Sequence, residues 1–323
     1  MKMKALHNRL IARILCALLL VTLLLPSAIS CGFAHAEAPT DADKALFTEL
    51  IEANSFSEII NRHSSKQSEV VYYNADGEEV HRFVDYVDAG QFSEETNGNG
   101  HIVTDTLQLW AETDDIGPYL LEVLLDEEDA YRELLASRQV EASLSIEPEE
   151  TLTEATEQNG CWYMTTEIAD ADWVSARLES DASTSGIEPL YAYAEGMSFA
   201  YCYVFDAETK DLLEIRTSLR EADGTVHSYA LDKVSYDMEY NTADSVFASY
   251  FEATEYSTLH LVFGPGTPEE FTATYMIPKG IYWTVEYQGV EYNGNVYTDP
   301  ECTQVYEGGK RPDEVTLYIP VQN

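Results

Sequence analysis

Apolar residues recur at helical spacing early in the chain and at strand spacing soon afterwards. Four of them share one helical face: Ala45, Leu46, Leu50 and Ile51. They predict a helix that begins near Asp43. Two β-rich runs follow at residues 70–73 and 80–86, on either side of Asp76-Gly77. Because glycine accepts a positive φ, this dipeptide predicts a hairpin between the two runs.

Helical spacing returns between Gly117 and Arg138. Four apolar residues line one face of the predicted helix: Tyr119, Leu120, Val123 and Leu124. The stretch CWYMTTEI at 161–168 has strand character, and DADWVSARLES at 170–180 predicts a short helix. Helices and strands therefore alternate along this part of the chain.

Residues 198–240 form the clearest predicted meander, with three strands that turn at 206–211 and at Asp223-Gly224. Along its first strand, every second residue is a large aromatic: Phe199, Tyr201, Tyr203 and Phe205. The residues between them are also apolar: Ala200, Cys202 and Val204. Apolar residues on both faces indicate a sheet that is covered by helices.

The composition changes near residue 257. Residues 257–323 are rich in Tyr, Thr, Val and Gly and lack a helical period, which predicts a small all-β domain. The predicted fold class is therefore α+β. We expect an antiparallel sheet with covering helices at 43–250, followed by the small all-β domain.

The order of strands and turns is similar to that of secreted lipoprotein-carrier-like (LolA-like) proteins over residues 43–245. The similarity rests on YCYVFDAETKDLLEI (201–215), the ADG turn at 222–224, the opening helix and the YYNADGEE hairpin. It implies a curved antiparallel sheet that wraps partly round helices and holds an acyl chain or another apolar ligand. It carries over no catalytic residue.

The C-terminal stretch resembles the closing half of the Listeria–Bacteroides (internalin B-type) repeats of surface proteins. Tyr297-Thr298-Asp299 and the later Thr-Leu-Tyr at 316–318 match that pattern, whereas Asn295-Val296 replaces its usual Gly-Trp. The resemblance implies a small β-domain used for display or contact. Independently of it, residues 315–318 alternate like a closing strand.

The first 36 residues have the features of an export signal. A basic start is followed by a run of twelve residues at 14–25 that is apolar except for Thr22 and too short to span a bilayer. Ala34-His35-Ala36 offers small residues for cleavage after position 36, which releases a chain that begins at Glu37. The alternative is a lipoprotein signal at 1–30, with lipidation of Cys31 after Ala-Ile-Ser. Either way, we expect an exported protein of the cell envelope or the extracellular space.

Charge limits the partners. Removal of residues 1–36 takes away four basic residues and no acidic ones, so the formal charge falls from −40 to −44. Such a chain repels nucleic acid and anionic lipid surfaces. No nucleic-acid partner is expected, and a membrane partner only through a lipid on Cys31.

Beyond the signal, three cysteines remain, and Cys161 with Cys202 is the better candidate for a disulfide in an oxidising compartment. No CxxC spacing occurs, so no metal site is predicted. We found no nucleophile elbow, zinc-protease helix or phosphate-binding loop. We therefore expect no cofactor and no enzyme, although carboxylates are too numerous for a catalytic pair to be recognised.

The leading hypothesis is an exported, non-catalytic binding protein whose first domain holds an unknown apolar small molecule or surface partner. Six aromatic residues are candidates to line its pocket: Trp110, Tyr119, Trp162, Trp173, Phe199 and Tyr201. The alternative is an adhesive or display module that acts through residues 257–323, and a hydrolase is the third hypothesis. An apolar cavity would favour the first, and an exposed aromatic patch without a cavity the second.

Overall fold

The computed structural model describes residues 38–320 with short gaps. The gaps fall at residues 97, 115–116, 125–127, 186–190, 269, 280–281, 288–294 and 307–312. Within the chain, Pro39–Asn323 forms one compact unit. The predicted signal, with Cys31 and its alternative cleavage site, lies outside the described residues.

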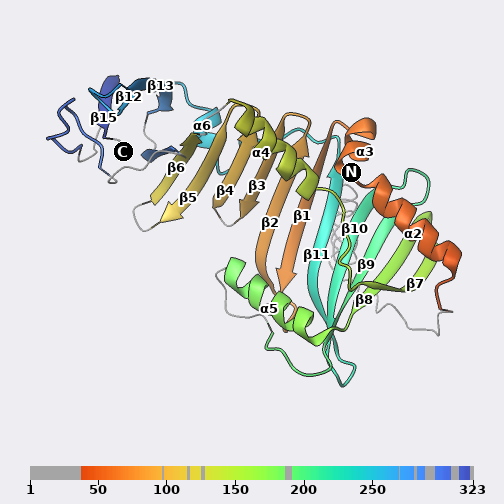
Figure 1. The fold of residues 1–323 in the computed structure, drawn as a ribbon. Helices are drawn as coiled ribbons and strands as arrows, with labels where there is room; N and C mark the ends of the chain where they lie inside the picture. Colours follow the sequence, from red (N-terminus) through yellow and green to blue (C-terminus); the bar gives the residue numbers. More distant parts are fainter. Residues whose placement is uncertain are drawn as a thin grey trace, which may run out of the picture. The chain divides into compact units, whose positions relative to one another are not determined.

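A twelve-stranded sheet dominates the described part of the chain (Figure 1). Its order is β14-β6-β5-β4-β3-β2-β1-β11-β10-β9-β8-β7. The strands before residue 130 are β1 (Ser65–Tyr73), β2 (Glu79–Asp88), β3 (Gln91–Thr96), β4 (Asn99–Thr104), β5 (Gln108–Asp114) and β6 (Gly117–Leu124). The later ones are β7 (Thr151–Gln158), β8 (Cys161–Ile168), β9 (Ser198–Asp206), β10 (Leu212–Arg220), β11 (Val226–Tyr236) and β14 (Tyr282–Tyr287). All neighbours are antiparallel except β14 and β6.

Within the described ranges, four helices pack on one face of this sheet: α2 (Asp41–Ala53), α3 (Phe56–Arg62), α4 (Glu128–Glu141) and α5 (Ala171–Ser185). Leu50 of α2 packs with residues of β8 to β11, Leu135 of α4 with β2 to β4, and Leu178 of α5 with β9 to β11. The cross-strand register places these strand residues on the same side of the sheet. The prediction of an α+β fold with a helix-covered antiparallel sheet agrees with this arrangement.

Asn54 joins the end of α2 to the sheet. Its Nδ2 donates to the carbonyls of Leu50 and Lys210, both at 2.8 Å, and its Oδ1 accepts from the Leu212 N–H at 3.0 Å. Asn54 is buried, so these bonds satisfy groups that would otherwise lose water without a replacement. The helix therefore has a defined place above β10.

A smaller three-stranded sheet has the order β13-β12-β15, from β12 (Tyr256–Phe263), β13 (Phe271–Pro278) and β15 (Glu314–Ile319). The predicted closing strand at 315–318 lies in β15, and Tyr297 forms a bridge to Tyr318. Leu261 and Phe263 of β12 share a core with Ile102 of β4 and with Phe247, which precedes the short helix α6 (Ala248–Phe251). The small sheet is thus packed against the rest of the chain.

Residues 257–323 do not form a β-domain that is separate from the large sheet. Strand β14, which belongs to this segment, pairs with β6 in parallel and extends the large sheet. The pairing of Trp283 with Leu120 illustrates the register. A composition change therefore marks the segment, but long-range strand pairing joins it to the preceding part.

The helix predicted across 117–138 is wrong in its first half. Residues Gly117–Leu124 form β6, and helix α4 spans Glu128–Glu141. The run PYLLEVLL is apolar almost throughout, and such a run fits a buried strand as well as a helix. Pairing with β5 on one side and β14 on the other decides for the strand.

Candidate functional site

A row of aromatic rings on β9 faces the helices. Phe199, Tyr201, Tyr203 and Phe205 follow one another with ring centroids 6.3, 6.3 and 6.4 Å apart. Their alternation with Ala200, Cys202 and Val204 was predicted from the sequence and is confirmed by the register. Because α2 and α5 cover the two ends of the row, its middle is left as an aromatic floor.

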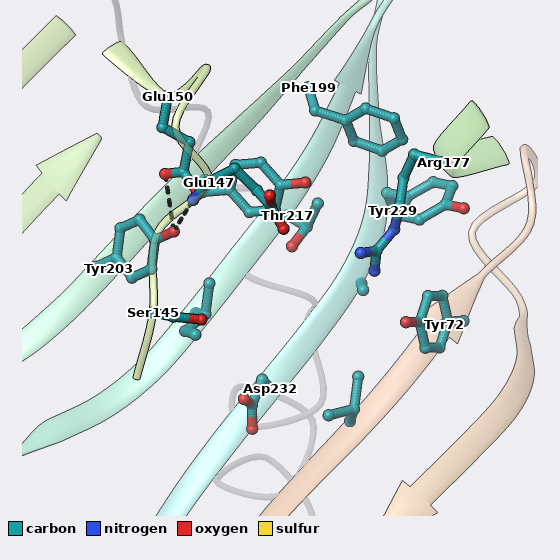
Figure 2. A pocket seen from close by; sticks show the side chains of 14 residues that line it. Tyr72, Ser145, Glu147, Glu150, Arg177, Phe199, Tyr203, Thr217, Tyr229 and Asp232 are labelled. Atoms are coloured by element: carbon teal, nitrogen blue, oxygen red, sulfur yellow. Dashed lines mark hydrogen bonds between the residues drawn. The ribbon is translucent and has the colours of Figure 1, made fainter. Parts of the chain in front are cut away.

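A cavity of about 240 Å³ lies over this floor (Figure 2). Its aromatic walls are Tyr72 on β1, Phe199, Tyr201 and Tyr203 on β9, and Tyr229 on β11. Polar groups come from the segment 142–150, from α5 and from the floor strands β10 and β11. They are Ser145, Glu147, Glu150, Arg177, Thr217 and Asp232.

A second cavity of about 230 Å³ adjoins the first and shares Val70, Ser145, Ile215 and Asp232 with it. Its floor comes from β1, β2, β3, β10 and β11, and one side from the end of α4. Lys66, Ser68 and Asp85 supply the polar groups of its floor. The two cavities together form a groove across β9 to β3, on the helix-covered face of the sheet.

The irregular segment 142–150, here called the strap, covers the groove and runs from α4 to β7 (Figure 1). One end is held by the Leu144 N–H, which donates to the carbonyl of Asn54 at 3.0 Å, and by Lys66 Nζ, which donates to the carbonyl of Ala142 at 2.8 Å. At the other end Glu150 accepts hydrogen bonds from the hydroxyls of Tyr203 and Thr166. The middle of the strap is exposed.

The charge of Arg177 is largely neutralised before any ligand binds. Its Nε lies 2.9 Å from Asp181 Oδ2, and the hydroxyl of Tyr229 donates to the same oxygen at 2.7 Å. Burial and the Asp181 carboxylate raise the pKa of Tyr229. Tyr229 therefore remains a neutral hydrogen-bond donor, and the cationic side of the first cavity is already paired.

The second cavity contains three partly or fully buried ionisable groups that form no ion pair with one another within 4 Å. Lys66 bonds to the strap, and Asp232 accepts from the hydroxyl of Ser68. Asp85 Oδ1 is buried and has no hydrogen-bond partner among the described residues. Burial, with further contributions from Glu94 and Asp232, raises the pKa of Asp85 to about 7. The same burial lowers the pKa of Lys66.

The six aromatic candidates have different positions. Phe199 and Tyr201 line the first cavity. Trp173 packs edge-on against Phe199 in the core under α5, and Trp162 packs at the margin of the core under α2. Trp110 stacks on His101 on β5 and β4, outside both cavities. Tyr119 lies on β6 instead of a covering helix, and its side chain is outside the described residues.

The predicted pairing of Cys161 with Cys202 needs correction. The structure forms no disulfide between them, and the register places Cys161 opposite Asp206 but Cys202 opposite Thr165. A shift of four residues separates the two by about 14 Å along the strand direction, because a strand rises about 3.4 Å per residue. A disulfide needs Cα atoms closer than about 7 Å.

Sequence reasoning missed the polar groups of the second cavity. Lys66 and Ser68 lie on the same face of β1 as Val70 and Tyr72, in the part of the strand that the predicted run at 70–73 did not include. Polar residues at inward positions were the available signal. Asp85 lies beside Ser68 only through the pairing of β1 with β2.

The described residues contain no group of three or more His, Cys, Asp or Glu side chains placed to hold a metal ion. His63 lies between two carboxylates, with Nδ1 2.9 Å from Asp237 Oδ2 and Nε2 3.1 Å from Asp211 Oδ1. Arg62 contacts the same Asp211 oxygen at 2.9 Å. No serine, threonine or cysteine of the described ranges is bonded to the His63 ring, so the cluster lacks the nucleophile of a catalytic triad and instead joins α3 to β10 and β11.

No helix in the described ranges combines the length and the apolar character needed to cross a membrane. No family model matches the sequence, and no curated protein matches it. A solved structure of PNGF-II is 8% identical, with a TM-score of 0.23, over 60% of this chain and 34% of that one. This chain thus spans about a third of that structure, and a score this low gives the likeness no weight as evidence of fold or function.

Proposed function

We propose that this chain is an exported, non-catalytic binding protein that holds an apolar or amphipathic small molecule in the groove under the strap. The observation that carries the proposal is the pair of adjoining cavities on the helix-covered face. Their volumes of about 240 and 230 Å³ approach the range of small-molecule sites, about 300–1,000 Å³. No tryptophan lines either of them among the described residues. The similarity to lipoprotein-carrier-like proteins suggests the same role.

Adhesion through the C-terminal segment is the second candidate. Exposed apolar side chains lie on the small sheet, with Met276 at 60% exposure and Phe271 at 38%. Phe271 stacks on Phe263 at 4.6 Å, so part of its surface is already used. Because the groove is present as well, we place the binding role there first.

The proposal predicts that a neutral apolar probe binds in the groove and that a bulky residue on its floor prevents this. Ala230 of β11 lines the first cavity, and Ala230→Trp would fill it. We expect N-phenyl-1-naphthylamine to gain fluorescence with the wild-type chain and to bind at least tenfold more weakly to the variant. The reason is that the tryptophan side chain and the probe would occupy the same apolar space.

Ser235→Trp is the matched control, because Ser235 is an exposed residue on the same strand. It should leave probe binding within twofold of wild type. Thr217→Phe, on the neighbouring strand, fills the same cavity with a smaller ring and guards against misfolding of the first variant. Circular dichroism confirms the fold in each case. The proposal is contradicted if the wild-type chain does not increase the fluorescence of the probe, or if Ala230→Trp and Thr217→Phe bind the probe as tightly as wild type.

A further inference from the structure

The buried carboxylate oxygen Asp85 Oδ1 is the least satisfied polar atom of the groove. It lies in the second cavity without a hydrogen-bond partner among the described residues. A buried acceptor in that state has lost its hydrogen bonds to water without a replacement, and a ligand that donates to it supplies the missing bond. The atom therefore favours ligands that carry an N–H or O–H group.

The charges around Asp85 favour a cation over a neutral donor. Asp232 and Glu94 lie close enough to raise its pKa, and Lys66 is the cation that opposes them. Glu141 of α4 also lines this cavity, but it is paired with Arg138 at 2.8 Å. Carboxylates thus outnumber ammonium groups among the described residues that line the approach to Asp85, and Lys66 is turned to the carbonyl of Ala142.

The first cavity adds aromatic faces to this negative surrounding. Tyr72, Tyr203 and Tyr229 line this cavity with Phe199 (Figure 2). Tyr201 lines it as well. The Arg177 guanidinium of this cavity is paired with Asp181. Glu147 and Asp232 also line the cavity and have no partner of opposite charge within 4 Å in the described part of the chain. Aromatic faces and carboxylates both attract organic cations.

We propose that the ligand is an amphipathic primary or secondary ammonium, whose N–H group donates to Asp85 Oδ1 and whose apolar part extends along the groove toward the aromatic floor. This inference rests on the proposed groove and names the class of molecule that the groove takes. A carboxylate bound through Lys66 and a neutral lipid are the competing outcomes of its test.

Four probes with the same eight-carbon chain test the head group by calorimetry at pH 8: octylammonium, octyltrimethylammonium, octan-1-ol and octanoate. We expect octylammonium to bind at least tenfold more tightly than octanol and octanoate, because the carboxylates around Asp85 attract its positive charge. Octyltrimethylammonium has no N–H group and should bind at least fivefold more weakly than octylammonium. Tighter binding of octanoate, or equal binding of all four, overturns the inference.

Asp85→Asn separates this inference from the groove itself. The variant should lose at least tenfold in octylammonium affinity and with it the preference for octylammonium over octan-1-ol. Glu79→Gln, an exposed carboxylate of the same strand outside both cavities, should change neither the affinity nor the preference. If N-phenyl-1-naphthylamine does not bind to the wild-type chain, the proposed binding groove is contradicted. If it binds but octylammonium is not preferred, the groove proposal stands and the proposed ligand class is wrong.

A pH series adds a second readout. Octylammonium should bind more tightly as the pH rises from 6 to 8, because Asp85 must ionise before it pairs with the cation. The ammonium stays charged throughout, as lysine does with its pKa of about 10.4. Asp85→Asn should remove this increase, and an unchanged pH dependence in the variant would assign it to another group.

Discussion

Asp85 has a stability consequence of its own, independent of any ligand. Its pKa of about 7 lies above the value of about 3.9 for an unfolded chain. Between these two values the folded state holds a proton that the unfolded state has released. Its contribution to stability is therefore fully present below pH 4 and is lost as the pH rises through 7.

We expect Asp85→Asn to raise the free energy of unfolding at pH 8 by about 1–4 kcal/mol and to change it little near pH 4. The amide has nearly the shape of the carboxylic acid but carries no charge to bury. Urea denaturation at pH 4, 6 and 8 measures the effect. Wild type and variant with parallel pH profiles would show that Asp85 is solvated in the folded state.

At the scale of elements, β4 forms the contact between the large sheet and the segment before the small one. A Cβ atom added to Gly100 would lie 2.6 Å from Val246 Cγ2 and 3.0 Å from Phe247 Cε2. Phe247 is fully buried in the core shared with β12. Glycine is thus needed at this position because another side chain occupies the space.

Gly100→Ala should therefore destabilise the chain by about 1–3 kcal/mol through overpacking. Gly90→Ala is a matched control, since its Cβ would meet only Asp88 Oδ1, at an ordinary 3.7 Å. Thermal or urea unfolding compares the two. Equal stability of both variants would mean that Val246 and Phe247 move aside without cost, and hence that this contact is loosely packed.

At the scale of the whole molecule, the proposed role depends on where the chain is sent. We expect the protein isolated from its native envelope to begin at Glu37 with no added mass, since Ala34 and Ala36 suit signal peptidase. Intact-mass and N-terminal analysis measures this. A diacylated Cys31 would instead make it a membrane-tethered lipoprotein, and a chain that retains residues 1–30 would contradict export.

Local patterns in the sequence determined the central meander and its aromatic floor. Alternation along β9 placed Phe199 and Tyr201 on one face, and Asp223-Gly224 predicted the turn in which Gly224 has a φ of +89°. These features depend on the order of neighbouring residues alone. For that reason the sequence was sufficient to predict them.

Tertiary structure alone decided β6, the pairing of β14 and the polar end of the groove. An apolar run such as PYLLEVLL fits either a strand or a helix until a partner strand satisfies its backbone. Asp85, Asp232 and the strap come from three distant parts of the chain, and strand register brings them to one cavity. Sequence spacing does not contain that register, because strand pairing depends on contacts between residues that are far apart in the chain.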